Sequence, residues 1–208
     1  MGTKERRERE RQGTRDRILD AAREMFVKDG VEAVTMRAIA EKIEYTPTAI
    51  YHHFRDKDAL LRELAEHDAG ELARAFQRIG KIEDPVERLR RIGYAYLRFG
   101  LENPSHYRFL FMTPSKERAG GPEKKKSSEA SYGFLRQAVS DAIASGRLRP
   151  ELTDPDQVSV ICWSITHGVV SLTIVFQPDQ WIRWPDPSRA GELAIDALLR
   201  GLLALPGA

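Results

Sequence analysis

Hydrophobic residues recur at three- and four-residue steps along most of the chain, which is the spacing of one face of an α-helix. The first clear stripe predicts a helix over residues 14–29, with Thr14 as its N-cap and Gly30 as its C-cap. We expect this helix to pack behind the segment that follows it. Its apolar positions are Ile18, Ala21, Ala22, Met25 and Phe26.

The next segment, residues 35–61, predicts two short helices separated by a tight turn, and then the start of a third helix. Thr35, Thr46 and Asp56 stand where N-caps are expected, and Pro47 takes the first position of the second helix. The side chains of the second helix divide into an inward set of Ile50, His53 and Phe54 and an outward set of Thr48, Tyr51, His52 and Arg55. Such a pair of helices fits the major groove of DNA, but an ordinary helical hairpin has the same pattern.

The remaining stripes also predict helices, so we expect an all-α fold. Their expected ranges are 56–80, 85–102, 105–112, 132–148, 155–177 and 188–205. Between two of them, residues 113–131 are rich in Pro, Gly, Ser and Lys, which predicts a loop.

Residues 158–177 contain no Asp, Glu, Lys or Arg, which raises the question of a membrane span. Ser, Thr and His side chains on every side of this segment argue against lipid contact. The apolar residues instead predict a helix buried through Ile161, Ile165, Val169, Leu172 and Phe176. This helix and the small-residue-rich closing helix are more apolar than a monomer requires, so we expect a homodimer that buries both in a four-helix bundle.

Charge is informative only locally. The 208 residues carry a formal net charge of +2, so the overall balance does not indicate a nucleic-acid partner. Residues 1–17, however, hold seven Lys and Arg against four acids, a net charge of +3. Such a run is typical of a solvated, frayed tail, and it is also typical of an arm that reaches DNA phosphates or the minor groove.

The sequence offers little for catalysis. Cys162 and His167 lie five residues apart, which separates them around a helix, and the His, Asp, Glu and Cys residues do not show metal-ligand spacing. We therefore expect no enzyme activity, no metal, no cofactor and no membrane partner. A single cysteine excludes a disulfide framework within the chain and fits a reducing cytoplasm, and the charged N-terminus does not look like a secretory signal.

The region from the first helix to the start of the fourth resembles the N-terminal helix-turn-helix domain of the TetR family of bacterial transcriptional regulators. The matching residues are Ile18, Ala21, Ala22, Phe26, Gly30, Thr35, Arg37, Ile39, Ala40, Ile43, Tyr45, Ile50, Tyr51, His53, Phe54, Lys57, Leu60 and Leu61. Two departures stand out: Glu44 replaces a usual Gly in the turn, so that a non-glycine residue there is expected to take positive φ, and Thr48-Ala49 replaces Gly-Thr or Gly-Ser.

The resemblance implies a two-domain dimeric regulator, with residues 14–60 as the DNA-binding domain and residues 61–208 as the helical regulatory, ligand-binding and dimerisation domain. It further implies a repressor that binds operator DNA and is released by a small-molecule effector. The expected DNA-binding residues are Thr35, Arg37, Thr46, Pro47, Thr48, Tyr51, His52 and Lys57. Among them, Arg37, Tyr51, His52 and Lys57 are expected to contact phosphates.

The effector site is less defined. The run LENPSHYRFLF and the pattern formed by Trp163 with His167-Gly168 resemble a TetR subgroup whose C-terminal domain is named for a Trp and a His-Gly pair. The ligand-pocket candidates are Tyr96, Phe99, Tyr107, Phe111, Trp163 and His167. Aromatic residues at helical spacing also fit a plain apolar core, so both interpretations stay open. The alternative for the whole chain is a helical small-molecule binding protein whose helix-turn-helix is non-functional.

Overall fold

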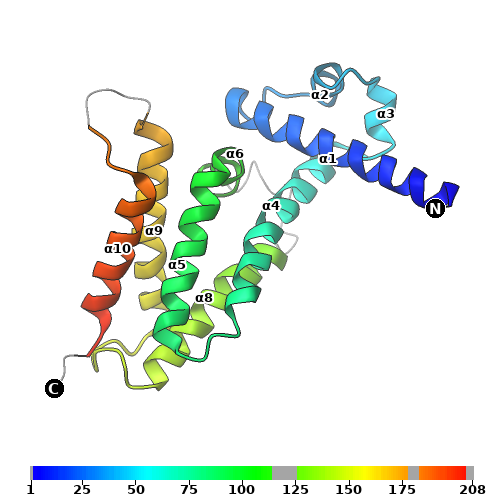
Figure 1. Ribbon diagram of the computed structural model, residues 1–208. Helices are drawn as coiled ribbons and strands as arrows, with labels where there is room; N and C mark the ends of the chain where they lie inside the picture. The colour runs from blue at the N-terminus through cyan, green and yellow to red at the C-terminus, as the bar shows by residue number, and fades with distance from the viewer. Residues whose placement is uncertain (1, 114–125, 178–182, 205–208) are drawn as a thin grey trace. The chain divides into compact units, whose positions relative to one another are not determined.

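The computed structural model describes residues 2–113, 126–177 and 183–204, without the side chains of 126–128 (Figure 1). The chain forms two compact units. The first unit comprises Met1–Asp68 and Ser105–Lys125, and the second comprises Ala69–Pro104 and Lys126–Ala208. Among the described residues the only β pairing is an isolated bridge between Leu148 and Leu203, so the predicted all-α class is confirmed.

The first unit contains the expected three helices and the beginning of a fourth. Their bounds are Thr3–Asp29 for α1, Met36–Lys42 for α2, Pro47–Tyr51 for α3 and Lys57–Ile79 for α4, of which α4 continues into the second unit. The apolar stripes predicted from the sequence pack together in one core that includes Ile18, Ala22, Phe26, Ile39, Ile50, Phe54, Leu60 and Leu64. Phe109 closes this core and stacks on Phe26 with ring centroids 6.2 Å apart.

The start of α1 differs from the prediction. The helix begins at Thr3, and Thr14 lies inside it, where its hydroxyl donates to the Glu10 carbonyl at 3.0 Å instead of capping a terminus. A frayed tail over the first residues is therefore wrong for the described part. The physical reason is composition, because Arg, Glu and Gln are strong helix formers and pair at three- and four-residue spacing. One such pair joins Arg11 to Glu8 at 2.9 Å.

The segment after α5 is helical, as expected, but in two pieces. A short α6, Pro104–Tyr107, runs into the π-helical turn η1, Arg108–Met112. The predicted loop over residues 113–131 lies largely outside the described residues. Its last part is corrected, because α8 spans Lys126–Ala144 and so begins earlier than the predicted residue 132.

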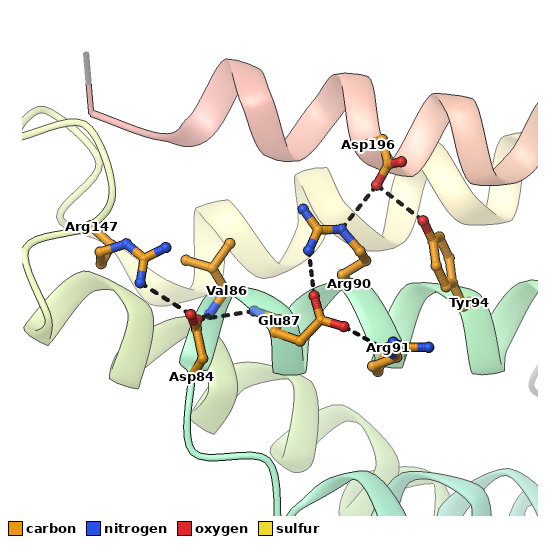
Figure 2. Close-up of polar contacts among 8 residues, drawn as sticks. All are labelled: Asp84, Val86, Glu87, Arg90, Arg91, Tyr94, Arg147 and Asp196. Carbon is orange, nitrogen blue, oxygen red and sulfur yellow. Dashed lines mark hydrogen bonds and ion pairs between the residues drawn. The ribbon is translucent and has the colours of Figure 1, made fainter. Parts of the chain in front are cut away.

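The second unit is built from α5 (Pro85–Glu102), α8, α9 (Pro155–Phe176) and α10 (Pro187–Leu202). Asp84, Asp154 and Asp186 each cap the helix that follows, and each is followed by a Pro at the first position of that helix. The Asp84 carboxylate accepts from the backbone N–H groups of Val86 at 2.8 Å and Glu87 at 3.1 Å (Figure 2).

A polar network fastens α5 to α10. Asp196 on α10 accepts from Arg90 Nε at 3.0 Å and from the Tyr94 hydroxyl at 3.1 Å, and Arg90 also pairs with Glu87 (Figure 2). The bonds to Asp196 and the neighbouring arginines lower the pKa of its carboxyl more than burial raises it. The network sets how α5 and α10 lie against each other in this unit.

The orientation of α9 differs from the prediction. Its buried positions are Val158, Ser159, Thr166, Val170 and Thr173. By contrast Ile161 (37% exposed), Ile165 (39%) and Leu172 (50%), which we expected to be inward, face away from this unit. By length and composition alone α9 is apolar enough to cross a membrane, which is weak support for a span.

Candidate nucleic-acid interface

The pose of α3 is fixed by local backbone chemistry. Thr35 accepts from the Ala38 N–H at 3.1 Å and Thr46 accepts from the Ala49 N–H at 3.3 Å, so both expected caps are present. Between α2 and α3 the turn passes through Glu44, which has φ 61° and is the one described non-glycine residue with positive φ. The turn closes with the Tyr45 N–H donating to the Ala40 carbonyl at 2.9 Å.

The inner and outer sides of α3 follow the spacing of the sequence. Ile50 is fully buried and Phe54, just after the helix, is 2% exposed. The Tyr51 ring is 53% exposed, although it is a large aromatic side chain. Of the eight DNA-binding candidates, Lys57 at the start of α4 is half-buried and the others are exposed, namely Thr35, Arg37, Thr46, Pro47, Thr48, Tyr51 and His52. Their side chains are thus available to a partner.

Arg15 of α1 positions the end of this helix-turn-helix, a role that the sequence pattern did not reveal. Its guanidinium donates to the His53 carbonyl at 2.8 Å and lies 4.4 Å from the centroid of the Phe54 ring. It also pairs with Glu63 on α4. In the sequence Arg15 is one more member of a charge run, and nothing there distinguishes it from its neighbours.

Positively charged side chains lie near the end of α3. Burial, followed by the charges of Arg15 and Arg11, lowers the pKa of His53 below its ordinary value. Arg37 pairs with Glu41 at 2.9 Å, but both side chains are well exposed. An exposed pair of this kind contributes little to stability, so Arg37 can exchange it for a phosphate.

The sequence pattern also did not reveal a buried ion pair between α1 and α4. Asp68 on α4 is fully buried, and its two oxygens accept from Arg23 of α1 at 2.6 and 2.8 Å. His67 lies 3.2 Å from the same carboxylate, and Arg23 also bonds Asp20 at 2.7 Å. The bidentate pair fixes α1 against the first half of α4.

The ligand-pocket candidates fall in both units. In the second unit Trp163 Nε1 donates to the Tyr96 hydroxyl at 2.8 Å, and the same hydroxyl lies 3.4 Å from His167 Nδ1. Phe99 is buried on α5 in that unit. In the first unit Tyr107 and Phe111 form a tilted ring pair with centroids 4.9 Å apart.

The cluster of Tyr96, Trp163 and His167 offers hydrogen bonds without charge. Burial lowers the pKa of His167, which favours the neutral imidazole at neutral pH. Burial also raises the pKa of the Cys162 thiol to about 12, which makes it a poor nucleophile. No group of three or more His, Cys, Asp or Glu able to hold a metal ion occurs in the described part of the chain.

Two regions of the chain match models of known protein families. A family model described as "Bacterial regulatory proteins, tetR family" matches residues 18–64, and one described as "Tetracyclin repressor-like, C-terminal domain" matches residues 89–198. Neither description mentions a Trp and a His-Gly pair, so the subgroup stays a prediction.

Similar curated proteins are named as transcriptional regulators. The HTH-type transcriptional regulator UidR of Escherichia coli is 26% identical over 170 residues, covering 78% of this chain and 82% of UidR. The HTH-type transcriptional repressor AcnR of Corynebacterium efficiens is 30% identical over 145 residues, covering 67% of this chain and 71% of AcnR. Among solved structures, a TetR family transcription regulator from Marinobacter aquaeolei shares the fold with a TM-score of 0.77, at 20% identity over 96% of this chain and 100% of that one.

Proposed function

Because the chain belongs to the TetR family of bacterial regulatory proteins and is a helix-turn-helix transcriptional regulator, we propose that it represses transcription as a homodimer that a small molecule releases from operator DNA. The observation that supports this proposal most strongly is that α3, which Thr46 caps, buries one side and leaves the other side exposed. In this proposal residues 14–60 bind DNA, and residues 61–208 provide the regulatory, ligand-binding and dimerisation domain. The protein acts in the cytoplasm, without a catalytic role.

The DNA-binding residues divide by chemistry. Arg37, Tyr51, His52 and Lys57 supply the donors that phosphates accept from, which gives affinity without sequence preference. Thr46, Pro47 and Thr48, at the start of α3, approach base edges, and Thr35 caps the helix that supports them. This division is supported by the general behaviour of helix-turn-helix proteins, whose recognition helix presents its first residues to base edges in the major groove.

The homodimer rests on an apolar side of α9. At about 100° per residue, one side of this helix carries Val160, Ile161, Ile165, Leu172 and Val175, all exposed in the single chain. Gly168 lies on the same side with open space around it, which allows a second helix to approach closely. Leu193 of α10 is 49% exposed as well. A second copy would cover this surface, and each fully buried side chain would stabilise the dimer by roughly 1.5–3 kcal/mol.

The effector is a small, largely apolar molecule with a hydrogen-bonding group. Tyr96, Trp163 and His167 support this class, because they place neutral donors and acceptors among aromatic rings. Phe99 belongs to the same unit, and Tyr107 with Phe111 provides a second aromatic candidate surface. Release follows if the effector favours a conformation whose two α3 helices no longer match two half-sites.

Binding measurements on two variants test the proposal. The DNA is a duplex recovered with the wild-type protein from a random-sequence library. Lys57→Ala should weaken binding to every duplex and reduce the salt slope by about 0.9 for each phosphate that the variant no longer neutralises. Thr48→Ala should instead change the preference among duplexes by roughly 1–3 kcal/mol for the base pair involved.

Two outcomes would contradict the proposal. If Lys57→Ala binds as the wild type does at every salt concentration, its phosphate role is wrong. If the wild-type protein recovers no sequence from the library, the chain is instead a helical small-molecule binding protein with a non-functional helix-turn-helix.

A further inference from the structure

The N-terminal turns of α1 form a charged helix that takes no part in the protein core. Residues 2–13 are exposed, whereas burial in α1 begins with Ile18 and Leu19. The helix nevertheless continues without interruption from Thr3. At 1.5 Å per residue, residues 3–13 extend α1 by roughly 16 Å, or about five base-pair steps of B-DNA. We call residues 3–13 the N-terminal arm.

The basic residues of the arm are not spread evenly around the helix. Lys4, Arg7 and Arg11 precede Arg15 at steps of three, four and four residues, so these four side chains share one side. Arg6 and Arg9 are turned away from every member of this row by about 100° or more, at about 100° per residue. We call Lys4, Arg7 and Arg11 the basic row.

The basic row leads directly to the helix-turn-helix. Arg15, at its inner end, donates to the His53 carbonyl at 2.8 Å and covers the Phe54 ring, immediately after α3. The charge of Arg11 also contributes to the lowered pKa of His53, after burial and Arg15. Within the first unit α1 runs past α3, with its N-terminal end beyond it (Figure 1). The row thus points toward the C-terminal end of α3, where Arg15 contacts His53 and Phe54.

We propose that the basic row binds DNA phosphates that flank the bases read by α3. Charge complementarity identifies the occupant, since a row of cations at helical spacing with no apolar residue suits a regular line of phosphates. The contact supplies affinity without base preference. This inference rests on the proposed DNA-binding function and adds a contact that lies outside the helix-turn-helix.

Glu8 is the acid that opposes this contact. Its carboxylate accepts from the Arg11 guanidinium at 2.9 Å. This bond, and to a smaller extent the charge of Lys4, lowers the pKa of Glu8. Since both side chains of the Glu8–Arg11 pair are more than 60% exposed, the pair is weak and Arg11 can exchange it for a phosphate. Removing the Glu8 carboxylate therefore favours DNA binding.

The test compares two variants that remove the same charge. Arg7→Gln/Arg11→Gln alters the basic row, and the matched control Arg6→Gln/Arg9→Gln removes two charges from the other sides of the same turns. Glutamine keeps the helix propensity of these positions, and far-ultraviolet circular dichroism checks that the helix content is unchanged. Binding to the library-selected duplex is followed by fluorescence anisotropy from about 50 to 200 mM KCl.

The row variant should bind roughly 10- to 100-fold more weakly at about 100 mM salt, with a salt slope reduced by about two per protomer. The control should keep the wild-type slope, and Glu8→Gln should bind more tightly than the wild type. If the row and control variants behave alike while the wild type binds its duplex, the arm inference is overturned and the function of the helix-turn-helix stands. If the wild type binds no duplex, both fail.

Discussion

At the scale of single residues, Glu44 occupies a turn position where the family usually has glycine. The turn between α2 and α3 requires a left-handed backbone there, with φ 61°. That conformation costs an L-amino acid other than glycine roughly 1–2 kcal/mol. The departure from the usual glycine was visible in the sequence, and the expectation of positive φ is confirmed.

Replacing Glu44 by Gly should therefore stabilise the protein. We expect Glu44→Gly to raise the free energy of unfolding by roughly 0.4–1 kcal/mol, the strain relief being partly offset by the greater freedom of glycine in the unfolded chain. Glu41→Gly, inside α2, is the matched control and should lower stability by about 1 kcal/mol. Urea unfolding measures both, and a loss of stability in Glu44→Gly would mean that the turn is not strained.

The buried pair of Arg23 and Asp68 is the most demanding electrostatic feature of the first unit. Burial raises the pKa of the Asp68 carboxyl, but the hydrogen bonds from His67 and Arg23 lower it by more. The pKa of Asp68 in the folded protein is therefore below its ordinary value of 3.8. A folded-state pKa below the unfolded one stabilises the fold above the ordinary pKa. That stabilisation is lost as the pH falls from about 3.8 through the folded-state pKa.

Asp68→Asn should leave the Arg23 guanidinium buried without its main partner. We expect a loss of roughly 3–5 kcal/mol at neutral pH, measured by thermal or urea unfolding. The difference from the wild type should narrow as the pH falls below about 3.8, because the wild-type carboxylate becomes protonated first in the unfolded chain and, at a lower pH, in the folded protein. Asp58→Asn, an exposed residue in the first turn of α4, serves as control. Equal stability of the two variants would show that the pair is not structurally important.

At the scale of elements, α5 and α10 approach each other through small residues. A Cβ placed on Gly191 of α10 would lie 2.4 Å from a terminal carbon of Leu97 on α5, which is closer than real contacts allow. On the same helix, a Cβ on Gly201 would meet nothing within 4 Å. One helix therefore contains a glycine required by packing and another that is not.

We expect replacement by alanine to have opposite effects on stability at these two glycines. Gly191→Ala should destabilise the protein by roughly 1–3 kcal/mol, since Leu97 or the helix must move. Gly201→Ala should stabilise it by up to about 1 kcal/mol, because alanine is the better helix former. Calorimetric unfolding compares them, and a stabilising Gly191→Ala would mean that α5 and α10 lie further apart than described.

Elements with local signals were the ones that the sequence could predict. The caps by Thr35, Thr46 and Asp84 follow from side chains that bond backbone N–H groups two or three residues onward, so the pattern is contained in a few positions. The inner face of α9 could not be predicted in this way. That helix has apolar residues on every side, so periodicity could not choose between the side facing its own unit and the other side.

The candidate site was likewise predictable only in part. The exposed side of α3 followed from the spacing of Ile50 and Phe54, which bury the opposite side. The support from Arg15, by contrast, depends on partners 38 and 48 residues away, which no local pattern encodes. The functional roles of the individual DNA-binding and ligand-pocket residues stay predictions.

At the scale of the whole molecule, operator binding as proposed requires two copies of α3 on one duplex. An exposed apolar side of α9 gives a reason for pairing, and a two-fold dimer places two recognition helices about one DNA turn, or a multiple of it, apart. Leu172, 50% exposed on that side, is a position where a charge should prevent pairing without disturbing the fold of the single chain. Affinity for DNA should then fall, because each copy holds only one half-site.

The mass of the protein–DNA complex in solution, measured by light scattering during size-exclusion chromatography on the library-selected duplex, tests this claim most directly. We expect an even number of wild-type chains per duplex, and we expect Leu172→Glu to elute as a monomer that forms no complex at the same concentration. A single wild-type chain that holds the duplex tightly, or a monomeric Leu172→Glu that binds as well as the wild type, would contradict the claim.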